Sequence, residues 1–364
     1  MPSERLRVGV VGYGYWGPNL VRNFAEVPGA VVSMVADTRP QRLEAIARRY
    51  PAVRTATDHR ELFADPHVDA VVIATPVSTH FELGRQALLA GKHVLLEKPM
   101  TSTVEQADEL IELADSLGLT LMVDHTFVYT GAVQKIKQLV LGGELGPIYY
   151  WDSVRVNLGL FQHDVSVVAD LATHDLSIMD YVLDRRPVAV TATGIAHVPG
   201  QSVNTAYLTC FFEDDLLAHF HVNWLAPVKV RRTLIGGQRR MIVYDDLEPS
   251  EKVKVYDSGI TLGNEAGRVE LLVGYRTGDM WAPRLSLDEA LAIEAQHFVD
   301  CVLGDRPSIT DGVAGRRVVR ILEAAARSLA DRGRPIELNW EHGDDVPRAA
   351  ARSPHPVPEP QAAY

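Results

Sequence analysis

The chain is poor in cysteine and has no surplus of basic residues, and each shortage excludes a class of protein. Its two cysteines, Cys210 and Cys301, lie far apart among 364 residues, so neither a disulfide framework nor a cysteine cluster for a metal is expected. We interpret both as small core residues. Acidic residues outnumber basic ones by 47 to 36, which gives a formal net charge of −11. General binders of nucleic acid or of anionic membranes need a basic face, so the composition argues against both.

Long apolar runs are missing as well. No segment approaches the roughly 18 apolar residues of a membrane helix, and the N-terminus lacks the apolar region of a signal peptide. Hydrophobic residues make up 46% of the chain and charged residues 23%, which is the balance of an ordinary globular protein. The length allows two domains with cores of their own. We therefore expect a cytoplasmic enzyme or binding protein.

A glycine-rich turn near the N-terminus is the feature around which the rest of the chain is organised. An apolar run ends at Val11 and is followed by Gly-x-Gly-x-x-Gly at Gly12, Gly14 and Gly17. In a strand–turn–helix unit the first glycine makes the tight turn. The second lets a pyrophosphate approach the backbone, and the third lets helix and strand pack closely. Such a pattern is weak evidence alone, so its meaning depends on the residues that follow.

Strands and helices alternate over the first third of the chain. Apolar runs predict strands at 6–12, 30–36, 68–74, 93–96 and 119–123, and helical patterns separate them at 18–27, 40–50, 60–63, 81–90 and 103–117. Strands that alternate with helices form βαβ units around a parallel sheet. We therefore predict an α/β Rossmann domain, which binds dinucleotides, over residues 1–124.

After about residue 125 the pattern changes to consecutive strands. Strand-like runs occupy 148–156, 188–198, 204–213, 216–225, 230–236, 240–245, 252–256 and 268–273, with helices at 131–141, 165–183, 287–303 and 312–332. This order predicts an α+β domain over residues 125–340, with a large, mostly antiparallel sheet and helices on one face. Residues 341–364 are rich in proline and poor in apolar residues, so we predict a disordered tail.

Residues at the ends of the predicted strands are candidates for the cofactor side of a site. Asp37 follows the second strand about 20 residues after Gly17, where an acid accepts hydrogen bonds from the ribose 2′-hydroxyl and repels a 2′-phosphate. Arg39 can stack on adenine. It can also bind a 2′-phosphate, and in that role it would weaken the preference for NAD. Thr75, Pro76 and His80 follow another strand end, where open sheets bind ligands. A plain turn or a helix cap is the alternative for each.

A second group of candidate residues could transfer the substrate proton or stabilise the charge that this transfer leaves. Lys98, between Glu97 and Pro99, could reach the cleft and stabilise an alkoxide, although most lysines are surface residues. Asp170 and His174 stand four apart, so on a helix they share one face. A histidine has the right pKa to take an alcohol proton near neutral pH, and Asp170 could hold the substrate or orient the imidazole. A helix start with a satisfied histidine is the alternative.

Two basic spots stand out in this acidic chain. Arg155 and Asn157 alternate on one strand, so both point to the same face. They could grip sugar hydroxyls or a phosphate, or they could form a solvated face. Lys229, Arg231 and Arg232 form the second spot, and for these three we favour the solvated face.

The glycine turn, Ala74-Thr75-Pro76, Glu97-Lys98-Pro99 and Asp170-x-x-x-His174 occur in this order, and over about residues 5–340 the chain resembles the Gfo/Idh/MocA oxidoreductase family. The resemblance implies an N-terminal Rossmann domain and a C-terminal open-faced sheet that packs against a partner subunit. It also implies oxidation or reduction of a secondary hydroxyl or keto group of a sugar-like molecule with NAD(H) or NADP(H). Lys98 would be the catalytic lysine, His174 the proton acceptor or donor, and Asp170 a substrate-positioning residue.

Two further stretches narrow the resemblance. Asp124-His125-Thr126-Phe127 and Asn157-Leu158-Gly159 are similar to a bacterial subgroup near lipopolysaccharide and antibiotic amino-sugar dehydrogenases, which act, where assigned, at the C3 hydroxyl of a hexose. This similarity makes His125 a candidate for lining the site.

The site is predicted as two sets of residues and no metal. The cofactor side comprises Gly12, Tyr13, Gly14, Tyr15, Trp16, Gly17, Asp37, Thr38, Arg39, Thr75, Pro76, His80, Glu97 and Lys98. The substrate side comprises Lys98, His125, Arg155, Asn157, Asp170 and His174.

The hypothesis is an NAD-dependent dehydrogenase that oxidises a secondary hydroxyl of a sugar, nucleotide-sugar, aminoglycoside or cyclitol, and that assembles as a homodimer or homotetramer. An NADPH-dependent ketosugar reductase is one alternative. A non-catalytic NAD(P)-binding regulator with the same fold is the alternative from another class. The presence of Lys98, Asp170 and His174 together argues against the non-catalytic regulator.

Overall fold

The computed structural model describes residues 5–159, 165–262 and 273–340. Its N-terminal part is a six-stranded sheet with the order β3-β2-β1-β4-β5-β6, and every neighbouring pair is parallel. The strands are β1 (Leu6–Val11), β2 (Ala30–Ala36), β3 (Arg54–Ala56), β4 (Ala70–Ile73), β5 (His93–Glu97) and β6 (Leu121–Asp124). Between them run α1 (Gly17–Glu26), α2 (Pro40–Arg49), α3 (His59–Ala64), α4 (His80–Leu89) and α5 (Val104–Leu117). The predicted Rossmann topology is confirmed.

Local signals in the sequence explain where these helices begin and end. The side chain of Thr103 accepts a hydrogen bond from the Gln106 N–H and so caps the start of α5. Gly118 ends the helix in the left-handed conformation, with φ 64°. Pro18 stands in the first turn of α1, where its missing N–H costs nothing.

The C-terminal part is a nine-stranded sheet with the order β16-β13-β12-β11-β7-β10-β9-β8-β17. Its strands are β7 (Ile148–Leu158), β8 (Ala189–Ile195), β9 (Thr205–Phe211), β10 (Leu217–Asn223), β11 (Leu225–Gly237), β12 (Met241–Asp245), β13 (Val253–Tyr256), β16 (Met280–Trp281) and β17 (Ile336–Glu337). Neighbours are antiparallel except β7 and β10, which are parallel. A separate ladder joins β14 (Gly259–Leu262) to β15 (Val273–Arg276).

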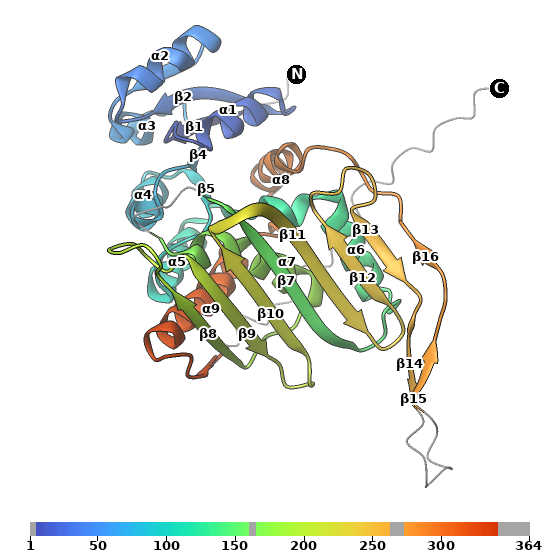
Figure 1. Cartoon of the computed structure of the whole chain (residues 1–364). Helices are drawn as coiled ribbons and strands as arrows, with labels where there is room; N and C mark the ends of the chain where they lie inside the picture. The colour runs from blue at the N-terminus through green and yellow to red at the C-terminus, as the bar shows by residue number, and fades with distance from the viewer. Residues whose placement is uncertain (1–4, 160–164, 263–272, 341–364) are drawn as a thin grey trace, which may run out of the picture.

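Helices cover one face of the large sheet and leave the other without a helix in front of it (Figure 1). The covering helices are α6 (Gly131–Leu141), α7 (Thr173–Leu183) and α9 (Gly312–Ala330), while α8 (Ala290–Gly304) lies between this part and the N-terminal sheet. Three short elements complete the order: η1 (Val77–Thr79), η2 (Thr126–Tyr129) and a π-helical turn, η3 (Val168–Ala172). This is the predicted α+β arrangement, and it confirms the fold class.

One apolar core runs through both parts and holds the two sheets in a fixed relation. It continues from β1 and α1 to α8, and from there to the helix-covered face of the large sheet. Phe24 of α1 meets Phe298 of α8 edge to face, with ring centroids 6.0 Å apart. Arg316 of α9 also donates to Asp108 of α5 at 2.7 Å. The space between the sheets is therefore a defined place for a site.

The structure also differs from the predicted elements. The short edge strands β3, β16 and β17 were not expected, because two or three residues carry no readable periodicity, and β14 was missed as well. The helix expected over 165–183 begins as the π-helical turn η3 and becomes α-helical only at Thr173. The strand expected at 268–273 falls mostly outside the described residues, and so does the proline-rich segment 341–364. Among the residues that the structure describes, no helix is both long and apolar enough to cross a membrane.

Candidate active site

The glycine turn has the backbone geometry that only glycine tolerates. Gly12 has φ +95°, and a Cβ on it would lie 2.4 Å from the carbonyl oxygen of Ala74. A Cβ on Gly17 would lie 2.3 Å from the carbonyl oxygen of Gly12. The first glycine therefore lets β1 turn tightly against the end of β4, and the third brings the start of α1 against the turn. Both are roles that the sequence pattern predicts.

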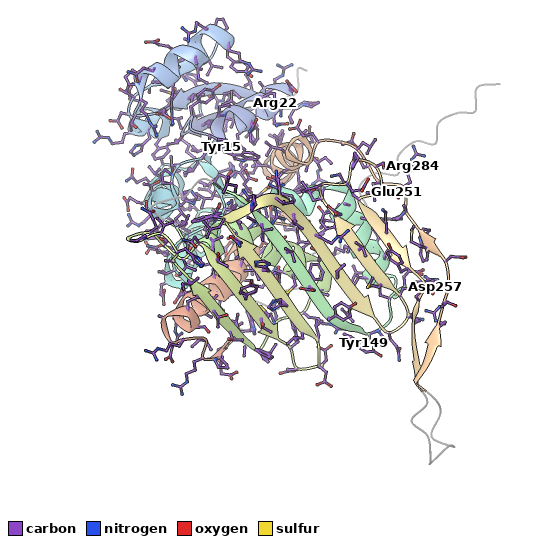
Figure 2. All side chains as sticks on the ribbon, viewed as in Figure 1. Tyr15, Arg22, Tyr149, Glu251, Asp257 and Arg284 are labelled. Carbon is purple, nitrogen blue, oxygen red and sulfur yellow. The ribbon has the colours of Figure 1, made fainter. Side chains whose placement is uncertain are left out.

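A single large cleft runs from this turn to the helix-covered side of the C-terminal part. Its volume is about 1460 Å³, which exceeds a typical small-ligand pocket and leaves room for a dinucleotide together with a second molecule. Most predicted residues line it: Gly12, Gly14, Tyr15, Trp16, Asp37, Thr38, Arg39, Thr75, Pro76, Glu97, Lys98, Asn157, Asp170 and His174. Tyr15 lies between the N-terminal elements and the large sheet (Figure 2).

Asp37 at the end of β2 is held by three donors. Its carboxylate accepts hydrogen bonds from the N–H of Tyr13 at 2.7 Å, the N–H of Arg39 at 2.8 Å and the guanidinium of Arg42 at 3.1 Å. Burial alone would raise the pKa of Asp37, but these donors outweigh it and hold the pKa below its ordinary value. A fixed negative charge therefore stands where the fold places the adenosine ribose. Arg42 was not predicted from the sequence.

Replacing Asp37 with alanine is expected to weaken NAD binding by about 10- to 100-fold, the effect of losing a hydrogen bond to a charged group. The same change leaves the guanidinium of Arg42 without its carboxylate and removes the negative charge beside Arg39, so NADP binding is expected to improve. Titrations of both dinucleotides against wild type and the variant measure the two effects. Asp58→Ala, which removes a carboxylate that caps α3, is the matched control. An unchanged NAD affinity in Asp37→Ala would contradict the assigned role.

Three predicted cofactor residues, Tyr13, Gly17 and His80, do not line the cleft, and Gly17 packs the start of α1 against the turn. His80 is 1% exposed, and its ring nitrogens lie 2.9 Å from the carbonyl oxygens of Pro99 and Thr75. It joins the two loops that carry Lys98 and Pro76 instead of facing a ligand. The side chain of Tyr13 is buried in the core, although its N–H contacts Asp37. A polar residue close to a strand end can face the cleft or can brace the loop behind it, and its position in the sequence does not distinguish the two.

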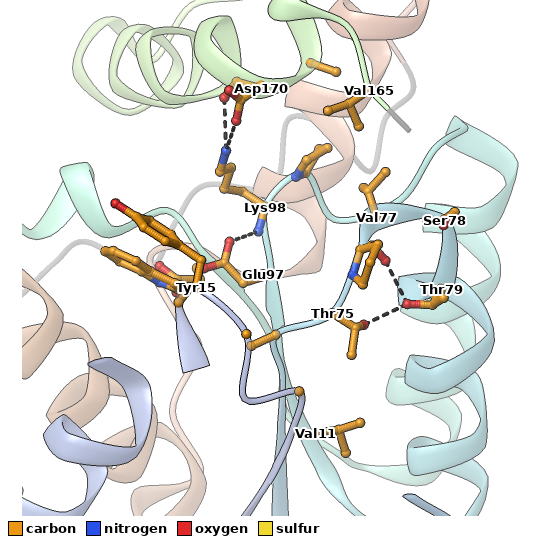
Figure 3. Close-up of a pocket in the computed structure, with 18 of the residues that line it drawn as sticks. Val11, Tyr15, Thr75, Val77, Ser78, Thr79, Glu97, Lys98, Val165 and Asp170 are labelled. Carbon is orange, nitrogen blue, oxygen red and sulfur yellow. Dashed lines mark hydrogen bonds and ion pairs between the residues drawn. The ribbon is translucent and has the colours of Figure 1, made fainter. Parts of the chain in front are cut away.

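Lys98 extends from the end of β5 towards the C-terminal part and meets Asp170 (Figure 3). Its ammonium nitrogen is 3.0 Å from Oδ1 of Asp170 and 3.0 Å from the carbonyl oxygen of the same residue. The other carboxylate oxygen of Asp170 accepts a hydrogen bond from the indole of Trp224 at 3.1 Å. Asp170 is therefore the partner of Lys98 in this structure, whereas the sequence left it as a partner of the substrate or of the imidazole.

His174 is the second residue of α7, just after the π-helical turn, and its side chain is partly buried. Its Nδ1 has no hydrogen-bond partner among the described residues, and its ring meets Phe127 edge to face at 4.9 Å. Burial, together with the charges of Lys98, Arg155 and Arg231, holds the pKa of His174 well below its ordinary value. The imidazole is therefore neutral at neutral pH and is able to accept a proton.

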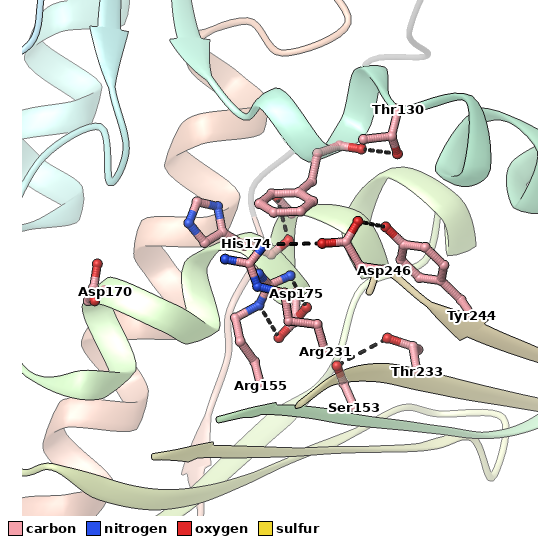
Figure 4. Close-up of polar contacts among 12 residues, drawn as sticks. Thr130, Ser153, Arg155, Asp170, His174, Asp175, Arg231, Thr233, Tyr244 and Asp246 are labelled. Atoms are coloured by element: carbon pink, nitrogen blue, oxygen red, sulfur yellow. Dashed lines mark hydrogen bonds and ion pairs between the residues drawn. The ribbon is translucent and has the colours of Figure 1, made fainter. Parts of the chain in front are cut away.

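A layer of ion pairs lies behind the imidazole (Figure 4). Arg155 donates twice to Asp175, at 3.0 and 2.8 Å, and Arg231 donates to Asp246 at 3.1 Å. Both guanidiniums lie over the ring of Phe127, at 4.5 and 5.5 Å. Arg231 lines the cleft but Arg155 does not. Arg155 therefore lies on the face of β7 that points to the site. Its charge, however, is neutralised by Asp175 and is not offered to a ligand.

The remaining candidates have other surroundings. His125 is 2% exposed and does not line the cleft. Lys229 and Arg232 are exposed and lie outside it, as the solvated-face interpretation expects. Phe127 and Trp224 line the cleft and were not predicted as site residues, because a lone aromatic residue in an apolar stretch is usually a core residue.

Comparisons with known proteins identify the family to which both parts of the chain are similar. Residues 6–125 match the model of an oxidoreductase family with an NAD-binding Rossmann fold, GFO_IDH_MocA, and residues 133–243 match the model of a GFO/IDH/MocA C-terminal domain.

Several relatives match most of the chain. UDP-N-acetylglucosamine 3-dehydrogenase from Acidithiobacillus ferrooxidans is 31% identical over 320 residues, covering 86% of this chain and 94% of that protein. An NAD(+)-dependent scyllo-inositol 2-dehydrogenase from Bacillus subtilis is 25% identical over 350 residues, or 93% and 97% of the two chains. The structure of GenD2 from gentamicin A biosynthesis, in complex with NAD, superimposes with a TM-score of 0.78 at 26% identity, over 93% of this chain and 97% of that one.

Proposed function

Because the chain belongs to the Gfo/Idh/MocA family of NAD-binding oxidoreductases, we propose that it oxidises a secondary hydroxyl of a sugar, nucleotide-sugar, aminoglycoside or cyclitol to a ketone. The observation that carries the proposal is the meeting of Lys98, Asp170 and His174 in the cleft that also contains the glycine turn and Asp37. A redox cofactor and a proton acceptor can therefore reach one substrate from two sides.

The residues of the cleft fit NAD. Gly12 lets β1 turn tightly and Gly17 lets α1 begin directly against the turn, so the N–H groups at the start of α1 would hold a pyrophosphate beside Gly14, which lines the cleft. The carboxylate of Asp37 would accept the ribose hydroxyls, and Thr75 and Pro76 would contact the side that leads to Lys98. When bound, NAD supplies the hydride acceptor.

The protein residues handle the proton of the substrate hydroxyl. His174 is neutral and takes this proton as the general base. Lys98 donates a hydrogen bond to the same oxygen and stabilises its developing negative charge. Asp170 holds the ammonium in place through the 3.0 Å ion pair, and the indole of Trp224 fixes the Asp170 carboxylate through a 3.1 Å hydrogen bond. Arg155 and Arg231 keep the imidazole unprotonated until the substrate proton reaches it.

The test is NAD reduction with a panel of UDP-sugars, free hexoses, inositols and aminoglycosides. Turnover with at least one sugar-like alcohol, and product analysis that places the ketone at C3, is the expected result. The C3 position is suggested by the UDP-N-acetylglucosamine 3-dehydrogenase relative, whereas the inositol relative is named for position 2. A chain that reduces a ketosugar with NADPH and oxidises nothing with NAD would contradict the proposed cofactor and direction. Absence of turnover across the whole panel would favour a non-catalytic role.

We also propose that the uncovered face of the large sheet packs against a second copy of the chain. Tyr150, Tyr207 and Leu217 on three neighbouring strands are 40%, 44% and 43% exposed, and the ring of Tyr207 stacks on His221 at 4.5 Å. Burying such a surface stabilises an assembly by about 25 cal/mol per Å². Light scattering should give the mass of a dimer or tetramer, and Tyr207→Arg should reduce that mass. A monomeric wild-type protein would contradict the proposal.

A further inference from the structure

Three carboxyl groups meet below the part of the cleft that contains Lys98. Glu97 and Asp124 are register partners at the ends of β5 and β6, and Glu294 reaches them from α8. Glu294 is 0% exposed, and neither of its carboxyl oxygens has a hydrogen-bond donor among the described residues. A fully buried carboxylate without a donor is costly, so its protonation state needs an explanation.

The neighbours of Glu294 indicate that it carries a proton. The Asp124 carboxylate already accepts hydrogen bonds from the indole of Trp16, at 3.1 Å, and from the hydroxyl of Thr126. Two buried carboxylates in contact cannot both stay ionised. Burial, the charge of Asp124 and a hydrogen bond with Asp124 hold the pKa of Glu294 well above its ordinary value. The proton on Glu294 therefore completes a third hydrogen bond to Asp124.

The other groups that face the cluster do not change this assignment. Burial and Asp124 also raise the pKa of Glu97 well above its ordinary value, although the charge of Lys98 and the Lys98 N–H act in the opposite direction. The Tyr129 hydroxyl of η2 also faces Glu294, and it stays protonated because burial raises its pKa. Lys98 is engaged by Asp170. One negative charge, on Asp124, is thus left in the cluster.

This charge lies at the redox end of the cleft. Trp16, Glu97 and Asp124 line it beside Lys98, between the glycine turn and the proposed proton acceptor. We propose that Glu294 keeps its proton and donates a hydrogen bond to Asp124, and that the single negative charge kept on Asp124 favours binding of NAD⁺ over NADH. The physical reason is that the nicotinamide ring carries a positive charge only in the oxidised form, and a buried opposite charge attracts it. The inference rests on the proposed function and adds a preferred direction of reaction to it. Oxidation of the substrate would be favoured, because NADH would dissociate more readily than NAD⁺.

Binding of the two cofactor forms, measured by calorimetry on the full chain, tests the inference. Wild type should bind NAD⁺ at least about tenfold more tightly than NADH. Asp124→Asn removes the charge and should lower this ratio by about tenfold. Glu294→Gln keeps a neutral donor towards Asp124 and should keep the wild-type ratio within about twofold, if Glu294 is already uncharged. Glu112→Gln, an exposed change on α5, is the control for removing a carboxylate elsewhere.

The outcomes separate the inference from the proposed function. Equal affinities for NAD⁺ and NADH in wild type would overturn the inference and leave the dehydrogenase standing. A Glu294→Gln variant that loses the preference as Asp124→Asn does would also overturn it, because Glu294 would then be ionised. Binding of neither form would overturn the proposed function, and the inference with it.

Stability as a function of pH gives an independent readout. A carboxyl whose folded-state pKa is raised contributes stability below its unfolded pKa and loses that contribution as pH rises through the folded value. Wild type should therefore lose more stability between pH 5 and pH 9 than Glu294→Gln. Parallel melting curves for the two proteins would show that Glu294 carries no proton and would overturn the inference.

Discussion

Replacing Lys98 with alanine is expected to lower kcat by about 10²- to 10³-fold, the effect of removing one preorganised donor to a developing oxyanion. The ammonium is held 3.0 Å from both the carboxylate and the carbonyl of Asp170, so its position does not have to be established at the moment of reaction. NAD should still bind with nearly wild-type affinity, because the glycine turn and Asp37 are untouched. Steady-state kinetics with the best alcohol of the panel, together with NAD titration, measure both effects.

Removing Lys98 also leaves Asp170 without its cation. Lys98→Met fills the space of the alkyl chain without the charge, so it separates loss of packing from loss of the donor. Lys92→Met is the matched control, since Lys92 is also buried, at the start of β5, and donates to the carbonyls of Asp65 and Val68 away from the cleft. Full turnover by Lys98→Met would remove Lys98 from the mechanism.

Replacing His174 with asparagine is expected to lower kcat by about 10²- to 10⁴-fold, the range for a lost general base. The pH dependence should change as well. Burial and three neighbouring cations hold the pKa of His174 well below 6.5, so the free enzyme should keep its activity below that pH. The rate should then fall as the imidazole becomes protonated. In His174→Asn this acid limb should disappear.

The same shift predicts a change in stability. A histidine with a lowered folded-state pKa contributes stability above its unfolded pKa and loses it as pH falls through the folded value. His174→Asn should therefore flatten the melting temperature against pH on the acid side. His67→Asn, at an exposed position near the N-terminal sheet, is the control. A variant with an unchanged pH–rate profile would show that another group takes the proton.

After burial and the charge of Lys98, Arg155 and Arg231 also lower the pKa of His174, and these two arginines illustrate what the sequence could and could not predict. Both are visible as basic residues on strands, and alternation correctly puts Arg155 on the face of β7 that points to the helices. The sequence does not show that Asp175 and Asp246 neutralise them, or that Arg155 lies behind the imidazole while Arg231 reaches the cleft. Such pairings join residues on different elements, so they depend on how those elements pack.

The sequence by itself determined the architecture and the positions of the reacting groups along the chain. The period of the apolar residues, the glycine turn and the strand-end positions of Asp37 and Lys98 are local signals, because backbone geometry and strand or helix periodicity act over a few residues. The order of the motifs was sufficient to indicate the family. The extent of the two domains and the roles of the individual site residues stay predictions.

Only the tertiary structure decided which residues act together. The pairing of Lys98 with Asp170, the contact of Trp224 with Asp170, the bracing position of His80 and the approach of Glu294 to Asp124 all join segments that are distant or unremarkable in sequence. Their energies come from burial and from charges brought within a few ångströms, and both exist only after the two sheets have packed on a shared core. For this reason Glu294 on α8, which no sequence pattern marks, keeps a proton and donates a hydrogen bond to Asp124 in the cofactor cleft.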